Sequence, residues 1–169
     1  MGSGRDERAS VRAAQRGSAS GIEALFRLHW PKAYRAAYLV VHDAAAAEDI
    51  AQEAFLAALR NLDRFDRSRP FGPWLHRIVV NRAIDWSRAR QLRAETELGE
   101  TLAAPEPAAP LDSSLLGALA ALPPDHRAVV VLRHLLEYTP GEIAKLLGVP
   151  RGTVNSRLRR GLDSLKERV

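Results

Sequence analysis

The sequence lacks cysteine altogether, and this absence excludes several classes of protein at once. Without thiols there is no disulfide framework, no cysteine nucleophile and no cysteine-ligated zinc site. Long apolar runs are also missing, because no stretch approaches the roughly 18 uncharged apolar residues of a membrane span. Residues 1–21 carry charges without an apolar centre, so they do not form a secretion signal. We therefore expect a cytoplasmic protein with no membrane insertion.

The sequence also contains few aromatic residues, at 6% of the chain, which predicts small and mostly aliphatic cores. Its histidines are scattered without the spacing of metal ligands, and no Ser/His/Asp arrangement or phosphate-binding glycine loop is present. We therefore expect no enzyme: no catalytic residue, no metal site and no cofactor.

What is present divides the 169 residues into four segments. Residues 1–17 are polar and short of large apolar side chains, which predicts a disordered tail. Residues 18–94 and 113–169 carry apolar residues at helical spacing, whereas residues 95–112 are rich in proline, alanine and glutamate, as in an extended linker. The expected fold class is all-α, with two small helical domains joined by a flexible linker.

Residues 45–62 form the clearest amphipathic helix of the first domain. It follows an apolar helical stretch in which Pro31 predicts a kink or a break. Its polar stripe contains one apolar residue, Leu56, and the stripe consists of Asp49, Gln52, Glu53, Leu56 and Arg60. On pattern alone, a stray leucine on a solvated face is the favoured interpretation.

A loop over residues 63–73 leads to a helix over residues 74–90, in which Leu75, Ile78, Val79 and Ala83 are expected to point inward. The outward row is Arg77, Asn81, Asp85 and Arg88. Arginine contacts phosphates and asparagine can read base edges, so this row favours nucleic acid. Asp85 is interpreted as an intrahelical partner of Arg82 or Arg88.

The second domain contains a helix-turn-helix signature. Thr139 to Glu142 has the arrangement of a capping box, and Gly148 suits the left-handed end of a short helix. A longer basic helix follows from Arg151, with Val154 and Leu158 on its buried side. Its other side offers phosphate and base-edge donors, namely Arg151, Thr153, Asn155, Ser156, Arg157, Arg159 and Arg160.

Three segments carry a family resemblance. EIAKLLGVPRGTVNSRLRRGLDSLKE, residues 142–167, resembles the C-terminal DNA-binding region of bacterial sigma factors. EDIAQEAFLAALRNL (48–62) and PWLHRIVVNRAIDWSRAR (73–90) resemble sigma region 2. Two domains of this size in this order resemble the extracytoplasmic-function (ECF) group of the sigma-70 family, with region 2 at 18–94 and region 4 at 113–169.

The resemblance implies a function and partners. The helix at 45–62 would dock on the clamp helices of the largest subunit of core RNA polymerase. Leu56 would then be an apolar anchor beside Asp49, Gln52 and Glu53. The flap region of polymerase is a further expected partner. The loop at 63–73 and the helix at 74–90 would capture and melt the −10 promoter element. The contact residues expected there are Asn81 and Arg88, with Arg77 and Arg82 as weaker candidates.

The second domain would read the −35 element in the major groove, with Ser156, Arg157, Arg159 and Arg160 most exposed. Phe71 and Trp74 are interpreted as core or loop anchors. The acidic linker would thread the polymerase channel or act as a plain spacer, and both interpretations stay open. The family also implies an anti-sigma partner, and the arrangement of the two domains in the free chain stays open.

Two other interpretations of the sequence remain. A stand-alone helix-turn-helix regulator would explain residues 139–168 but would leave 45–90 without a role. A sigma-like inhibitor is also compatible with the sequence.

Overall fold

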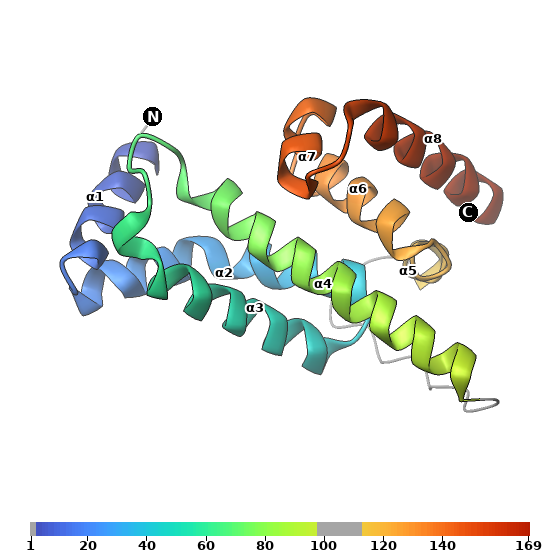
Figure 1. Cartoon of the computed structure of the whole chain (residues 1–169), viewed down its shortest axis with the longest axis horizontal. Helices are drawn as coiled ribbons and strands as arrows, with labels where there is room; N and C mark the ends of the chain where they lie inside the picture. The colour runs from blue at the N-terminus through green and yellow to red at the C-terminus, as the bar shows by residue number, and fades with distance from the viewer. Residues whose placement is uncertain (1–2, 98–112) are drawn as a thin grey trace.

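The computed structural model describes residues 3–97 and 113–169, which are helical and contain no β-strand (Figure 1). This confirms the all-α expectation. The elements are α1 (Ser3–Gln15), α2 (Ala19–Val41), α3 (Ala44–Arg60), the 3-10 helix η1 (Leu62–Arg64), α4 (Phe71–Thr96), α5 (Ser113–Ala120), α6 (Pro124–His134), α7 (Pro140–Leu147) and α8 (Arg151–Arg168). None of these helices is long and apolar enough to cross a membrane. The linker expected at 95–112 falls mostly outside the described residues.

Helices α2, α3 and α4 pack around a core that includes Leu25, Phe71 and Val79. The expected break at Pro31 is wrong, because α2 continues through it from Ala19 to Val41. A proline inside a helix removes one hydrogen bond and costs about 3 kcal/mol. The fully buried alanines on the far side of Pro31 offset that cost by packing against neighbouring helices.

The N-terminal segment corrects the expectation of a disordered tail at 1–17, because Ser3–Gln15 forms α1 and packs on α2. Only Val11 and Ala14 of this helix are buried and apolar, which is too few for a local pattern to reveal. Close approach is possible because Gly21 has no side chain where the two helices meet. Tertiary contact therefore orders a segment whose composition predicts a tail.

Helices α5 to α8 form the second unit, and α7 with α8 is the expected helix-turn-helix. Thr139 caps α7: its hydroxyl accepts from the backbone N–H of Glu142, and the Glu142 carboxylate accepts from the Thr139 N–H. Gly148 ends the helix with a φ of 66°. Ile143 and Val154 are fully buried between the two helices. The capping and turn predictions are confirmed.

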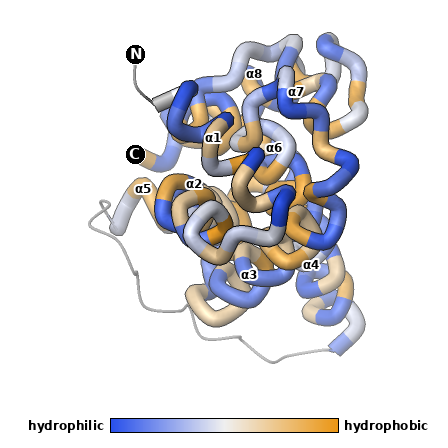
Figure 2. Tube along the Cα trace, turned by 90° about the vertical axis from the view of Figure 1, so that its left-hand side faces the viewer, coloured by the Kyte–Doolittle hydropathy of each residue, from blue (hydrophilic) through white to orange (hydrophobic). Residues whose placement is uncertain are grey.

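The two units pack against each other, which answers the question that the sequence leaves open. Helix α6 lies between the helix-turn-helix and the bundle of α2, α3 and α4 (Figure 2) and contacts both α2 and α4. The buried Arg127 of α6 donates to the Val40 carbonyl at the end of α2 and to carbonyls at the end of α5. Two of the −10 candidates on α4, Asn81 and Arg88, also contact the second unit.

Candidate functional site

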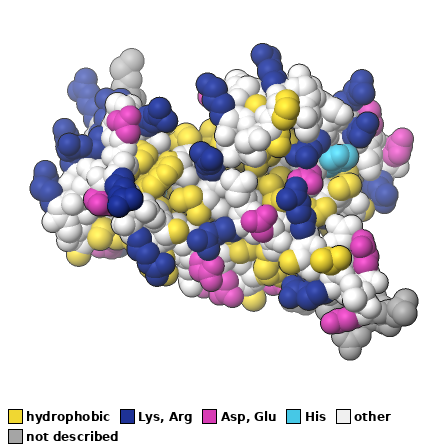
Figure 3. Space-filling view, viewed as in Figure 1, with side chains coloured by type: hydrophobic (Ala, Val, Ile, Leu, Met, Phe, Trp, Pro, Cys, Tyr) yellow, Lys and Arg dark blue, Asp and Glu magenta, His cyan; other side chains and the backbone are white. Residues whose placement is uncertain are grey.

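The outer face of α3 presents the stripe expected from the sequence. Asp49, Gln52, Glu53 and Leu56 are exposed, while the helix buries Ile50, Ala54, Phe55 and Ala58 on its other side. Leu56 is 50% exposed and is one of few large apolar side chains at the surface. Acidic side chains gather along this part of the molecule (Figure 3). An apolar side chain within a polar rim is a common arrangement at the centre of a protein interface.

One residue of this stripe contacts the neighbouring helix. The Glu53 carboxylate lies 2.9 Å from the guanidinium of Arg82 on α4. Both side chains are largely exposed, so the pair contributes little to stability. It does place one candidate polymerase contact directly beside one candidate −10 contact.

The outward row of α4 faces two different environments. Arg77 is exposed, but Asn81 is half-buried, and its amide donates to the Arg77 carbonyl at 2.8 Å and to the Leu146 carbonyl of α7 at 3.4 Å. Asp85 makes no ion pair with another described residue. Its expected pairing with Arg82 or Arg88 is wrong, because both of those arginines reach carboxylates on other helices.

The recognition helix α8 buries Val154, Leu158 and Gly161. Of the seven candidate DNA contacts on this helix, Arg151, Asn155, Arg159 and Arg160 are exposed. Thr153, Ser156 and Arg157 are half-buried. The expectation that Arg157 and Ser156 are among the most exposed is therefore wrong, because α6 packs along this side of α8.

Asp125, in the first turn of α6, joins the two basic helices. Its Oδ1 atom lies 2.5 Å from an amino nitrogen of Arg88 on α4 and 3.7 Å from one of Arg157 on α8. A carboxylate between two guanidiniums is favoured by both charges. Sequence reasoning missed Asp125, and an acid in the first turn of a helix is too common to single it out. In this arrangement one carboxylate pairs with both a candidate −10 arginine and a candidate −35 arginine.

A second polar contact joins the units near the start of α4. The Nδ1 atom of the buried His76 lies 2.7 Å from the hydroxyl oxygen of Tyr138, in the turn before α7. Burial lowers the pKa of His76 to about 4, so the ring is neutral at pH 7. The same burial raises the pKa of the Tyr138 hydroxyl. The contact is thus one between neutral groups.

Aromatic side chains anchor the loop between η1 and α4. Phe71 is fully buried, and Trp74 stacks on Phe65 with ring centroids 4.7 Å apart. The prediction that Phe71 and Trp74 are core or loop anchors is confirmed. The loop that precedes α4 is therefore held on the core by its aromatic residues, while its charged residues face solvent.

Comparison with known proteins matches both units. The family model described as "Sigma-70 region 2" matches residues 25–93, and "Sigma-70, region 4" matches residues 113–165. The ECF RNA polymerase sigma factor SigW of Bacillus subtilis (strain 168) is 31% identical over 176 residues, covering 94% of each chain. The RNA polymerase sigma factor CarQ of Myxococcus xanthus is 35% identical over 157 residues, covering 89% of this chain and 90% of CarQ.

A solved structure agrees with these matches. CnrH, in complex with the cytosolic domain of CnrY, superposes with a TM-score of 0.71 at 25% identity and covers 96% of each chain. A stand-alone helix-turn-helix regulator would leave the match at 25–93 unexplained. The chain belongs to the sigma-70 family, in which it is an ECF RNA polymerase sigma factor.

Proposed function

We propose that this sigma factor docks on the clamp helices of core RNA polymerase through the exposed face of α3, formed by Asp49, Gln52, Glu53 and Leu56. The observation that supports this most strongly is Leu56, half exposed in the middle of an acidic and polar stripe that no described element covers. Burial of an apolar side chain provides affinity, and the polar rim provides specificity.

The same proposal assigns −10 recognition to α4 and −35 recognition to α8. Arg77, Asn81, Arg82 and Arg88 would hold the −10 strand, and the donors of α8 would enter the major groove of the −35 element. Sigma factors are not enzymes in general, and melting here needs only binding energy. Unpairing costs a few kcal/mol per flipped base, which pocket contacts and stacking offset.

DNA binding through these residues requires the two units to separate. Asn81 donates to α7, and Arg88 and Arg157 share Asp125, so both basic helices are engaged within the chain. Promoter phosphates and polymerase, including its flap region, would replace these contacts. CnrH is solved with the cytosolic domain of CnrY, and by that likeness we propose a protein partner here too, an anti-sigma factor in the cytoplasm.

The test is transcription in vitro with core polymerase from the same host, this protein and a library of genomic promoter fragments. Discrete new start sites that share an upstream pair of elements are the expected result. If no start site forms while the protein alone footprints duplex DNA, the proposed function fails and a stand-alone regulator replaces it.

Leu56→Ala is expected to weaken binding to core polymerase about 10- to 30-fold, which corresponds to about 1.4–2 kcal/mol and reaches the lower edge of hot-spot losses. The fold should persist, because Leu56 is half exposed. Competition of labelled protein for core polymerase measures the affinity. Leu92→Ala is the matched control, since Leu92 is an exposed leucine on α4. Equal affinity of Leu56→Ala and wild type would refute the role of α3.

Asn81→Ala should leave core binding unchanged and reduce open-complex formation about 10-fold, because a base-reading side chain contributes about 1–3 kcal/mol. Permanganate reactivity of unpaired thymines at the promoter reports the melted state. Asp85→Ala removes a negative charge from the same row of α4 and should not lower the signal. An Asn81→Ala holoenzyme that melts promoters like wild type would show that Asn81 has no part in the −10 contact.

A further inference from the structure

The N-terminal helix α1 has a basic face that the proposed function leaves unused. Arg5, Arg8 and Arg12 lie on one side of α1, and Arg16, one residue beyond its end, continues the spacing of i, i+3, i+7 and i+11. All four are exposed, and none makes an ion pair with another described residue. The opposite side packs on α2 through Val11. The helix is therefore held by its apolar side and presents arginines to solvent.

Two polar contacts fix the position of α1. The Gln15 amide donates to the carbonyls of Leu62 and Phe65, at 2.8 and 3.2 Å, and so ties the helix to η1 and the start of the following loop. On the inner side, a Glu7 oxygen lies 2.8 Å from the Nε2 atom of His29. That contact draws an acidic side chain of α1 toward the core and away from the arginine face. The result is a rigid placement of the arginines relative to the loop before α4.

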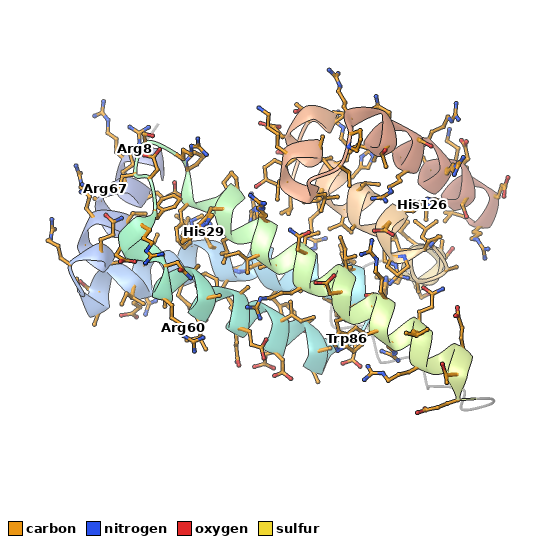
Figure 4. The ribbon with its side chains drawn as sticks, in the orientation of Figure 1. Arg8, His29, Arg60, Arg67, Trp86 and His126 are labelled. Atoms are coloured by element: carbon orange, nitrogen blue, oxygen red, sulfur yellow. The ribbon has the colours of Figure 1, made fainter. Side chains whose placement is uncertain are left out.

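The loop contributes further arginines to the same end of the molecule. Arg64 and Arg67 are exposed and make no ion pair with another described residue. Figure 4 labels Arg8 and Arg67 at this end, and Figure 3 shows Lys and Arg side chains gathered there. We call this set the N-terminal basic surface, and its members are Arg5, Arg8, Arg12, Arg16, Arg64 and Arg67. By contrast, Arg82, Arg88 and Arg157 already face carboxylates.

From this arrangement we infer that the N-terminal basic surface is an additional DNA site, which holds the phosphate backbone of the promoter beside the −10 element. The inference rests on the proposed function, because the loop leads directly into α4, the helix assigned to that element. The stripe of α3 that is proposed to face polymerase is acidic and polar, whereas the N-terminal basic surface carries the opposite charge. That positive charge fits a polyanion such as DNA. A cluster of guanidinium groups fits phosphate oxygens, which supply half or more of the hydrogen bonds at protein–DNA interfaces.

The first test measures the salt dependence of promoter binding by the holoenzyme, on a promoter identified in the transcription experiment. Arg8→Gln/Arg12→Gln should lower the slope of log affinity against log salt by about 1.4, at about 0.7 for each single-strand phosphate contact. The loss should be equal for promoters of different sequence. Arg27→Gln/Arg35→Gln removes two exposed arginines of α2 and should keep the wild-type slope. A wild-type slope for Arg8→Gln/Arg12→Gln would overturn the inference.

The second test moves α1 without changing its charge. A methyl group on Gly21 would lie 2.7 Å from the Ala14 nitrogen and 2.9 Å from the Ser10 oxygen, so Gly21→Ala should displace the helix. We expect this variant to lose the same slope as Arg8→Gln/Arg12→Gln while it still binds core polymerase. Retention of the full slope by Gly21→Ala would overturn the inference, because the inference depends on the docked position of α1.

The absence of cysteine permits a direct mapping of contacts. A DNA-cleaving iron chelate attached to Arg12→Cys in the holoenzyme should cut the promoter beside the −10 element, whereas the same reagent on Arg35→Cys should not. Cleavage confined to polymerase subunits would overturn the inference. Wild-type protein that supports no initiation would instead refute the proposed function, so the two failures are distinguishable.

Discussion

Arg127→Met is expected to lower the free energy of unfolding by about 3 kcal/mol or more. The Arg127 guanidinium donates to the carbonyls of Val40, Leu119, Ala120 and Leu122. The Val40, Leu119 and Ala120 carbonyls lie at the C-terminal ends of α2 and α5, where the helix dipoles also favour a positive charge, and Leu122 lies just beyond α5. Burial lowers the pKa of Arg127 to about 10, so it stays charged at pH 7. Methionine fills a similar volume but leaves the carbonyls without a donor.

Urea denaturation of the full chain measures this loss. The Tm should also fall by roughly 6–12 °C, because about 1 kcal/mol shifts the Tm by about 2–4 °C in a chain of this size. The matched control is Arg133→Met on the same helix, because Arg133 is exposed and makes a single longer bond to the Tyr138 carbonyl. We expect Arg133→Met to stay within about 0.5 kcal/mol of wild type. An Arg127→Met chain as stable as Arg133→Met would show that the carbonyls find other donors.

Acidification should destabilise the fold through His42 and His76. Burial is the main cause that lowers the pKa of each to about 4, and the charge of Arg127 adds to the effect on His42. The unfolded chain takes up these protons near pH 6.5, so the fold is most stable above that value and loses stability as the pH falls toward 4. Each histidine contributes a slope of about 1.4 kcal/mol per pH unit, and together they cost about 5 kcal/mol between pH 7 and 4.5.

Urea denaturation at a series of pH values between 7 and 5 tests this, in a range where ordinary carboxylates have not yet protonated. His76→Gln should reduce the slope of unfolding free energy against pH by about 1.4 kcal/mol per pH unit, which corresponds to one proton. Glutamine is neutral and can still contact Tyr138. His42→Asn/His76→Gln should remove the share of the slope that these two residues contribute, while His29 and His126, whose pKa values burial also lowers, keep theirs. Asparagine tolerates the left-handed backbone of His42, with a φ of 52°. A double variant with the wild-type slope would place the protonation elsewhere.

Local patterns predicted much of the fold. The apolar rows of residues 45–62 and 74–90 identified α3 and most of α4, because helical periodicity is a property of neighbouring residues alone. The capping box at Thr139 and the left-handed Gly148 likewise follow from local backbone chemistry, and the structure confirms both. The polar stripe around Leu56 is also visible in the sequence, although only the family resemblance implies a contact with polymerase for it.

Contacts between segments far apart in the chain could not be predicted from local sequence patterns, and the reason is physical. Two apolar residues in α1 are too few to predict a helix, yet with Gly21 opposite they suffice to dock one. The helix at Pro31 continues because burial of the alanines beyond it outweighs the lost hydrogen bond. The exposure of Arg157 depends on which helix packs beside α8, and no periodicity encodes that choice.

Local sequence patterns encode the all-α fold class, the helix caps, the helix-turn-helix and the family, since each depends on residues close together in the chain. The packing of the helices, in contrast, sets which of the described arginines face a carboxylate. Arg88 and Arg157 meet at Asp125 although they are 37 and 32 residues from it along the chain, while the exposed arginines of α1 make no ion pair with any other residue that the structure describes. Charge pairing depends on distance in space, because the attraction between two charges falls with their separation and with exposure to water.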